Sequence, residues 1–216
     1  RLGPKSLAKI PDVSSRRVGA LPLGAMVLSR LIAATKVKKV EISAYGLREG
    51  VLFDQLSDAD RTGDPLLAGA SDLAKRLVRF PEHRHELGDW VAPLFGPGGL
   101  GETDGQKRLR LAACSLADIG WYVHPDYRAM HAFEQTLLAP LAGVNHAERV
   151  FLARVGFHRH EGAGEPAAFG NLSGLLKEED HHRAQVLGLA LRVAFTLCAA
   201  TVGLLPYTRL VLTKDA

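Results

Sequence analysis

The apolar positions of the first 56 residues predict a small arrangement of helices around one strand. Apolar side chains recur every three or four positions across residues 23–34, which is the period of a helix with one apolar face. Residues 40–43 alternate apolar and polar side chains, as a half-buried strand does. A glycine-containing loop follows, and residues 51–56 are again helical in pattern. We expect a helix, a strand, a loop and a helix, which is too little for an independent sheet.

A polar run rich in Asp, Gly and Pro at residues 57–65 marks a break in the chain. Beyond it, the apolar spacing is helical almost throughout. The helices predicted there cover residues 66–79, 82–95, 106–119, 126–139, 146–159 and 177–203. We therefore predict a mainly α fold in two parts, residues 1–58 with the single strand and residues 59–216 as an all-helical domain.

The most apolar stretch, residues 184–205, is long enough to raise the question of a membrane span. Arg192 lies in its middle, and a charge at the centre of a membrane costs about 2.5–3.5 kcal/mol. We therefore expect a buried core helix and no membrane partner. Hydrophobic residues make up 47% of the chain and charged residues 23%, an ordinary balance for a globular protein.

Two features bear on the origin of the chain. Its two cysteines, Cys114 and Cys198, both lie in apolar runs and are expected to be buried free thiols, as is usual in the cytoplasm. No signal peptide is recognisable, and the sequence opens on Arg1 rather than Met. We expect a piece of a longer cytoplasmic protein.

Positive charge is concentrated near the N-terminus. Residues 1–40 carry nine of the 27 Lys and Arg residues but one of the 23 acidic residues, so the remainder is net negative although the whole chain is +4. Such asymmetry either indicates an anionic partner or is a solvated surface. Arg16 and Arg17 lie within this basic segment and are candidate anion-binding residues.

The string Gly-Leu-Arg-Glu-Gly occupies residues 46–50, between the predicted strand and the next helix. Backbone amides at a strand–glycine–helix junction can hold an anion, and Arg48 can add a bidentate contact to phosphate. The alternative is a tight turn in which Arg48 and Glu49 pair at the surface. A second glycine pattern, at residues 96–101, formally matches a dinucleotide fingerprint, but no strand precedes it, and we expect a flexible connection between helices.

Together, these motifs resemble a known family. Leu-Pro-x-Gly-Ala at residues 21–25, followed by the helix, a Lys-rich turn, the strand and the string at residues 46–50, resembles the end of the second actin-like domain of Ppx/GppA phosphatases. Ala-Asp-Ile-Gly-Trp at residues 117–121, with His-Pro-Asp-Tyr-Arg at residues 124–128 and then His131, is similar to their helical third domain. The resemblance covers essentially the whole chain.

The resemblance implies a function for the parent protein. Members of the family release terminal phosphate from inorganic polyphosphate or guanosine pentaphosphate, with Mg²⁺, between two actin-like domains. Their phosphate loops and catalytic carboxylate precede the part that this chain resembles, so we expect no catalytic residue and no cofactor here. Residues 1–58 would end the second actin-like domain, and Gly46, Arg48, Glu49 and Gly50 would contact phosphate.

The resemblance also implies that residues 59–216 are an HD-like domain with a degenerate metal site. An intact HD site uses His, an adjacent His-Asp pair and a distant Asp to bind a divalent ion. His83 and Asp118 match two of these positions and His131 lies nearby in sequence, but Ala117 and Phe195 replace the other two ligands. We expect no bound metal, because a site needs the right ligand count.

Two roles remain open for this chain. It can give a polyphosphate or guanosine pentaphosphate hydrolase its substrate-binding and dimerisation surface, or it can be a non-catalytic interaction module. A homodimer through the apolar residues 184–203 is expected in either case, with no nucleic-acid partner. An active HD phosphohydrolase with an unusual ligand set is the third and weakest reading, because Ala117 and Phe195 cannot bind a metal.

Overall fold

The computed structural model describes residues 6, 14–43, 45–164 and 167–211, and the chain divides into two compact units, Arg1–Ser57 and Asp58–Ala216. The described part of the first unit contains α2 (Ser15–Val18), α3 (Leu21–Thr35) and α4 (Leu47–Asp54). Both helices predicted there from apolar spacing are present, but the second begins at Leu47, so residues 47–50 of the predicted loop form its first turn. None of the described residues of these helices is buried, so α3 exposes its apolar face.

The strand predicted for residues 40–43 is wrong. These residues have no regular secondary structure and are exposed, with Ile42 at 99%. A strand is held by hydrogen bonds to a neighbouring strand, and no described residue of this chain forms one. Alternation alone therefore does not make this segment a strand.

The second unit is all-helical over its described residues, which confirms the mainly α prediction. Its helices are α5 (Asp58–Thr62), α6 (Pro65–Leu77), α7 (Arg84–Val91), α8 (Asp104–Leu116), α9 (Pro125–Leu138), α10 (His146–Glu161) and α11 (Glu178–Cys198). Short 3₁₀ turns occupy Pro81–His83, Ala92–Leu94, Ala167–Leu175 and Leu205–Tyr207. Each of the six helices predicted beyond residue 65 has its counterpart, with ends shifted by a few residues.

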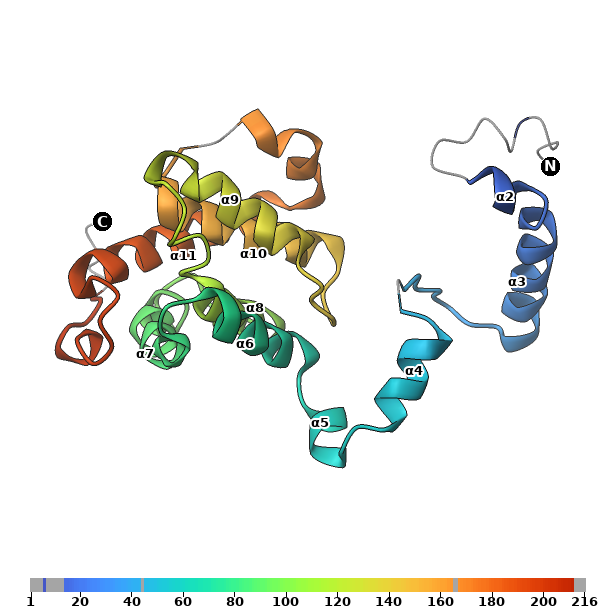
Figure 1. Cartoon of the computed structure of the whole chain (residues 1–216), viewed down its shortest axis with the longest axis horizontal. Coiled ribbons are helices and arrows are strands. Elements are labelled where there is room, and N and C mark those ends of the chain that lie inside the picture. The colour runs from blue at the N-terminus through green and yellow to red at the C-terminus, as the bar shows by residue number, and fades with distance from the viewer. Residues whose placement is uncertain (1–5, 7–13, 44, 165–166, 212–216) are drawn as a thin grey trace. The chain divides into compact units, whose positions relative to one another are not determined.

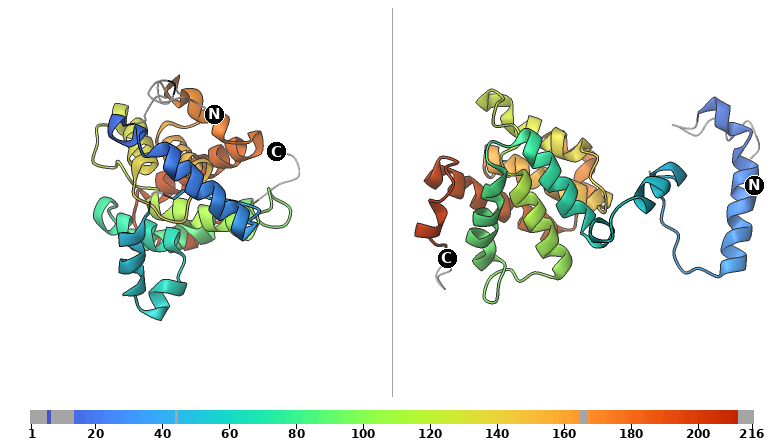
Figure 2. Two further views of the ribbon diagram at one scale, coloured as in Figure 1. Left: turned by 90° about the vertical axis from the view of Figure 1, so that its right-hand side faces the viewer. Right: turned by 60° about the horizontal axis from the view of Figure 1, so that its bottom comes forward.

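Within this unit the helices pack as two groups around one main core. Helix α8 contacts α6 and α7, and α10 contacts α9 and α11 (Figures 1 and 2), while α10 also packs on α8 and α11 on α7. The core is filled by fully buried leucines from several helices: Leu66, Leu87, Leu152, Leu187 and Leu191. Burying one such side chain stabilises the fold by about 1.5–3 kcal/mol.

Side chains at the helix starts satisfy backbone amides that have no partner within the helix. Asp64 accepts hydrogen bonds from the Leu66 and Leu67 amides and so caps α6. Thr103 with Gln106, and Asn145 with Glu148, form reciprocal capping boxes at α8 and α10. These local signals explain why the helical unit begins its helices close to where periodicity predicted them.

The glycine-rich residues 96–103 lead from the 3₁₀ turn after α7 to the start of α8, which confirms a helix–helix connection and not a dinucleotide loop. Two buried arginines hold this loop against the domain. Arg183 donates to the Gly101 carbonyl at 2.7 Å, and Arg110 pairs with Glu102 at 2.7 Å. The loop is therefore held against the domain by side chains.

Helix α11 accounts for the apolar run near the C-terminus. Nine of its residues are buried in the domain, and the helix ends at Cys198, earlier than predicted. Both cysteines are buried free thiols, as predicted. No helix among the described residues combines the length and the apolar character that a membrane crossing requires.

Candidate functional site

The predicted phosphate-binding residues of the first unit lie on exposed helices. Gly46 is the N-cap of α4, and its amide donates to the Glu49 carboxylate at 2.7 Å, which lowers the Glu49 pKa. Arg48 and Gly50 are exposed on the same helix, and Arg16 with its neighbour Arg17 is exposed on α2. Because the Glu49 carboxylate already accepts from the Gly46 amide, that amide is not available to an anion in this arrangement. Phosphate binding by these residues stays a prediction.

In the second unit, two of the three predicted HD residues come together. His83 and Asp118 are buried and line one cavity with Phe195 and Cys114. The cavity volume is about 10 Å³, the room that a single water molecule needs. His131 does not line this cavity; its ring hydrogen-bonds to the Tyr122 hydroxyl at 2.9 Å.

The Asp118 carboxylate is held by two guanidinium groups. Arg79 makes a bidentate contact, with Nε 2.7 Å from Oδ2 and Nη2 2.9 Å from Oδ1. Arg159 adds a third hydrogen bond to Oδ1 at 3.1 Å, and its guanidinium stacks 4.0 Å from the Phe195 ring centroid. The Arg159 side chain is 11% exposed and that of Asp118 is 2% exposed. These residues form a charge triad in which Asp118 and Arg159 are buried and the Arg79 side chain is 34% exposed, and every charge has a partner.

These residues do not fit a divalent metal. Both Asp118 oxygens are engaged by cations, and Phe195 covers the position expected for a fourth ligand. The His83 Nε2 instead lies 3.8 Å from the Cys198 sulfur, and burial lowers the His83 pKa. Among the described residues, no group of three or more His, Cys, Asp or Glu side chains could hold a metal ion. The Arg159 and Arg79 guanidiniums supply the positive charge that a metal would bring.

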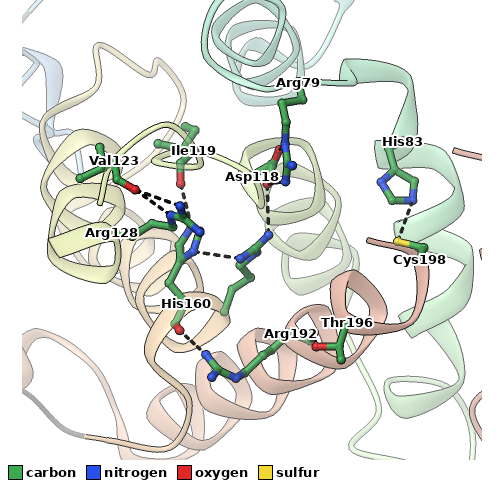
Figure 3. Close-up of polar contacts among 11 residues, drawn as sticks. Arg79, His83, Asp118, Ile119, Val123, Arg128, His160, Arg192, Thr196 and Cys198 are labelled. Atoms are coloured by element: carbon green, nitrogen blue, oxygen red, sulfur yellow. Dashed lines mark hydrogen bonds and ion pairs between the residues drawn. The ribbon is translucent and has the colours of Figure 1, made fainter. Parts of the chain in front are cut away.

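On the other side of Arg159 and Arg79, the domain opens into a pocket of about 480 Å³, which we call the arginine pocket. Figure 3 shows three of its arginines: Arg128 and Arg192 lie beside His160, and Arg79 lies at Asp118. The pocket is lined by Arg79, Pro125, Arg128, Arg159, His160, Arg192, Phe195, Thr196, Ala199 and Ala200. No lining residue is acidic; Asp118 contacts the arginines from the core side.

Arg128 and Arg192 have donors to spare. Arg128 uses two nitrogens on the Val123 carbonyl, at 3.1 and 2.9 Å, and Arg192 donates to the His160 carbonyl near the C-terminus of α10. Neither forms an ion pair with a carboxylate in the described part of the chain. A guanidinium carries five N–H donors, so both retain donors that can meet an anion.

His160 is a neutral hydrogen-bonding link within this cluster. Because Arg159 can only donate, the His160 Nδ1 accepts from it at 2.9 Å, and Nε2–H donates to the Ile119 carbonyl at 2.8 Å. Burial and then the Arg159 charge lower the His160 pKa to about 3. Burial likewise lowers the Arg159 pKa to about 10, against the pull of Asp118, so Arg159 stays charged at neutral pH.

The His160 shift predicts an acid-sensitive fold. The folded pKa of about 3 lies below the ordinary 6.5, so the unfolded state binds more protons and stability falls as the pH falls below 6.5. We expect a loss of about 1–2 kcal/mol between pH 7 and pH 5, measured by urea unfolding. His160→Gln should flatten this dependence. An unchanged slope in that variant would contradict the assignment.

The backbone next to the pocket is strained. Ala199 and Ala200, which end α11 and line the pocket, both have left-handed backbone angles, with φ of 47° and 62°. Such conformations are unfavourable for alanine and gather at functional sites. They reverse the chain directly after the helix that carries Arg192.

Little in the amino-acid sequence indicates this pocket. Its four arginines come from four separate segments, and no short motif unites them. One residue of the pocket is unusual in the sequence: Arg192 is a charge within an apolar run. That charge argues against a membrane span but does not by itself indicate a binding site. Arg128 stood within a family-like motif, but nothing in the sequence places it near Arg79 or Arg159.

Comparisons with known proteins match both units of the chain to one family. The family model described as exopolyphosphatase, C-terminal, matches residues 66–216, and the model of the Ppx/GppA phosphatase family matches residues 2–59. The chain is 28% identical over 152 residues to Retrograde regulation protein 2 of Saccharomyces cerevisiae. That alignment covers 67% of this chain and 24% of the relative, so it spans about a quarter of the yeast protein.

Proposed function

The chain belongs to the Ppx/GppA phosphatase family, and we propose that it is the C-terminal part of an exopolyphosphatase-like hydrolase that binds the phosphate chain of the substrate. The substrate class is inorganic polyphosphate or guanosine pentaphosphate, as the family resemblance implies. The observation that carries the proposal is the arginine pocket, which four arginines line and in which the Asp118 carboxylate pairs with only two of them, Arg79 and Arg159.

A condensed phosphate chain suits this pocket chemically. Guanidinium groups bind phosphate oxygens in a bidentate geometry, and each phosphate that is neutralised releases counterions and adds affinity. The volume of about 480 Å³ lies within the range of small-molecule sites. Arg79 and Arg159 are fixed by Asp118, so part of the site is ordered before a ligand arrives.

The lining groups do not provide hydrolytic chemistry. The arginines are donors, the His160 Nδ1 is already engaged by Arg159, and the Thr196 hydroxyl donates to the Arg192 carbonyl at 2.8 Å. The pocket therefore has no carboxylate to act as general base among its lining residues. We assign to this chain binding rather than cleavage, and place the Mg²⁺-dependent chemistry of the family in other parts of the parent protein.

The proposal is tested by measuring polyphosphate binding to the chain over a range of salt concentrations. We expect Arg128→Gln/Arg192→Gln to weaken binding about tenfold or more and to lower the salt slope by about 1–2. The control is Lys107→Gln/Lys177→Gln, which removes the same charge at exposed positions at the N-terminal ends of α8 and α11. Equal losses in both variants would contradict a specific pocket and leave only net charge.

The predicted homodimer has less support in the structure than the sequence suggested. Most apolar residues of α11 face the core of their own domain, although Val193 and Leu197 remain exposed at 48% and 54%. Dimerisation, like the cytoplasmic location, therefore stays a prediction.

A further inference from the structure

Three large aromatic residues stand exposed beside the arginine pocket, and we call them the aromatic rim. Trp121, Tyr122 and Tyr127 are 39%, 51% and 69% exposed, in the connection from α8 to α9 and the first turn of α9. Exposed aromatic side chains gathered at one place are a feature of binding surfaces, because their faces offer stacking area.

The rim is joined to the pocket by direct contacts. The Arg79 guanidinium, which lines the pocket, lies over the Trp121 ring at 5.3 Å from its centroid. Arg128, another lining residue, holds the Val123 carbonyl of the rim loop with two hydrogen bonds (Figure 3). The same two arginines therefore touch both the space for an anion and the loop that carries the aromatic rings.

The rim is also held in place. The Tyr122 hydroxyl contacts His131 Nε2 at 2.9 Å and accepts from Gln135 Nε2 at 3.2 Å, both on α9. The Trp121 and Tyr122 rings meet edge to face, with centroids 6.0 Å apart. An ordered aromatic surface loses little conformational entropy when a flat group stacks on it.

We propose that the arginine pocket and the aromatic rim together bind a nucleotide that carries two or more phosphates. The inference rests on the proposed function, since it places the phosphate chain among the arginines, and it adds that a base stacks on Trp121. An aromatic face gives a bare phosphate chain nothing to stack on, whereas every nucleobase has a π face. The rim thus favours a nucleoside polyphosphate over linear polyphosphate.

The experiment compares GTP with inorganic tripolyphosphate, which has the same number of phosphates, by calorimetry on the whole chain without added metal. Tripolyphosphate is ionised at both ends, so charge alone favours it. We expect GTP to bind about tenfold more tightly and to quench tryptophan fluorescence, because base stacking contributes on that scale. Trp121→Ala should remove this preference and leave tripolyphosphate affinity unchanged.

Tyr207→Ala is the matched control, since Tyr207 is an aromatic residue that is 88% exposed outside the rim and the pocket lining. Equal or tighter binding of tripolyphosphate, with Trp121→Ala affecting both ligands alike, overturns the nucleotide inference and leaves the proposed function standing. If neither ligand binds, both proposals fail. If the preference for GTP survives Trp121→Ala, base stacking on this residue is wrong.

Discussion

Replacing Asp118 by alanine should lower the free energy of unfolding by about 3–5 kcal/mol, because it leaves two guanidiniums without their counter-charge. Asp118 is 2% exposed and makes three hydrogen bonds, two to Arg79 and one to Arg159. Removal of one partner from a buried ion pair exposes the full desolvation cost of the other. Urea unfolding at neutral pH, followed by circular dichroism, measures the loss.

The matched control is Asp72→Ala. Asp72 pairs with Arg76 one helical turn away, but both side chains are more than 60% exposed, so we expect a change below about 0.5 kcal/mol. Adding a chelator distinguishes a charge triad from a metal site at Asp118. We expect it to leave the unfolding midpoint of the unmodified chain unchanged, because Arg79 and Arg159 occupy the carboxylate. A loss below about 1 kcal/mol in Asp118→Ala would contradict the triad.

The parts of this fold that the sequence predicts well are those set by local rules. Helix periodicity and capping residues such as Asp64 and Thr103 act within a few positions, so helix locations in the second unit were predictable. The strand at residues 40–43 was not, because alternation specifies a face but not a partner strand. The helix predicted for residues 177–203 ends earlier than predicted, at Cys198, since apolar character continues in the sequence past the left-handed residue Ala199, where the helix stops.

The candidate site was only partly predictable. Family-like spacing pointed to His83 and Asp118, and the structure places them around one cavity. Nothing local indicated that Arg159, 41 positions from Asp118, would take up its carboxylate. Long-range pairs of this kind are set by helix packing, here of α10 against α8 and α11. A short segment of sequence does not specify which helices will pack together.

The close packing of α11 on α10 at Gly188 predicts a second large loss of stability. A methyl group added there would lie 2.5 Å from the His158 Cβ and 2.8 Å from the Val155 carbonyl oxygen, closer than van der Waals contact allows. Because the second of these atoms belongs to the backbone, a rotamer change cannot relieve the clash. We expect Gly188→Ala to destabilise the fold by about 3 kcal/mol, near the upper end for overpacking, as measured by urea unfolding.

The same substitution should also weaken the arginine pocket, because Gly188 lies one helical turn before Arg192, and α10 carries Arg159. Moving α11 away from α10 separates these two guanidiniums, so we expect polyphosphate affinity to fall along with stability. Gly156→Ala is the control: this glycine is also buried on α10, but its added methyl group would find its nearest neighbour at 3.8 Å. There the higher helix propensity of alanine should leave stability unchanged or raise it by up to about 1 kcal/mol. Similar losses in the two variants would show that the close contact at Gly188 is not what holds α10 and α11 in register.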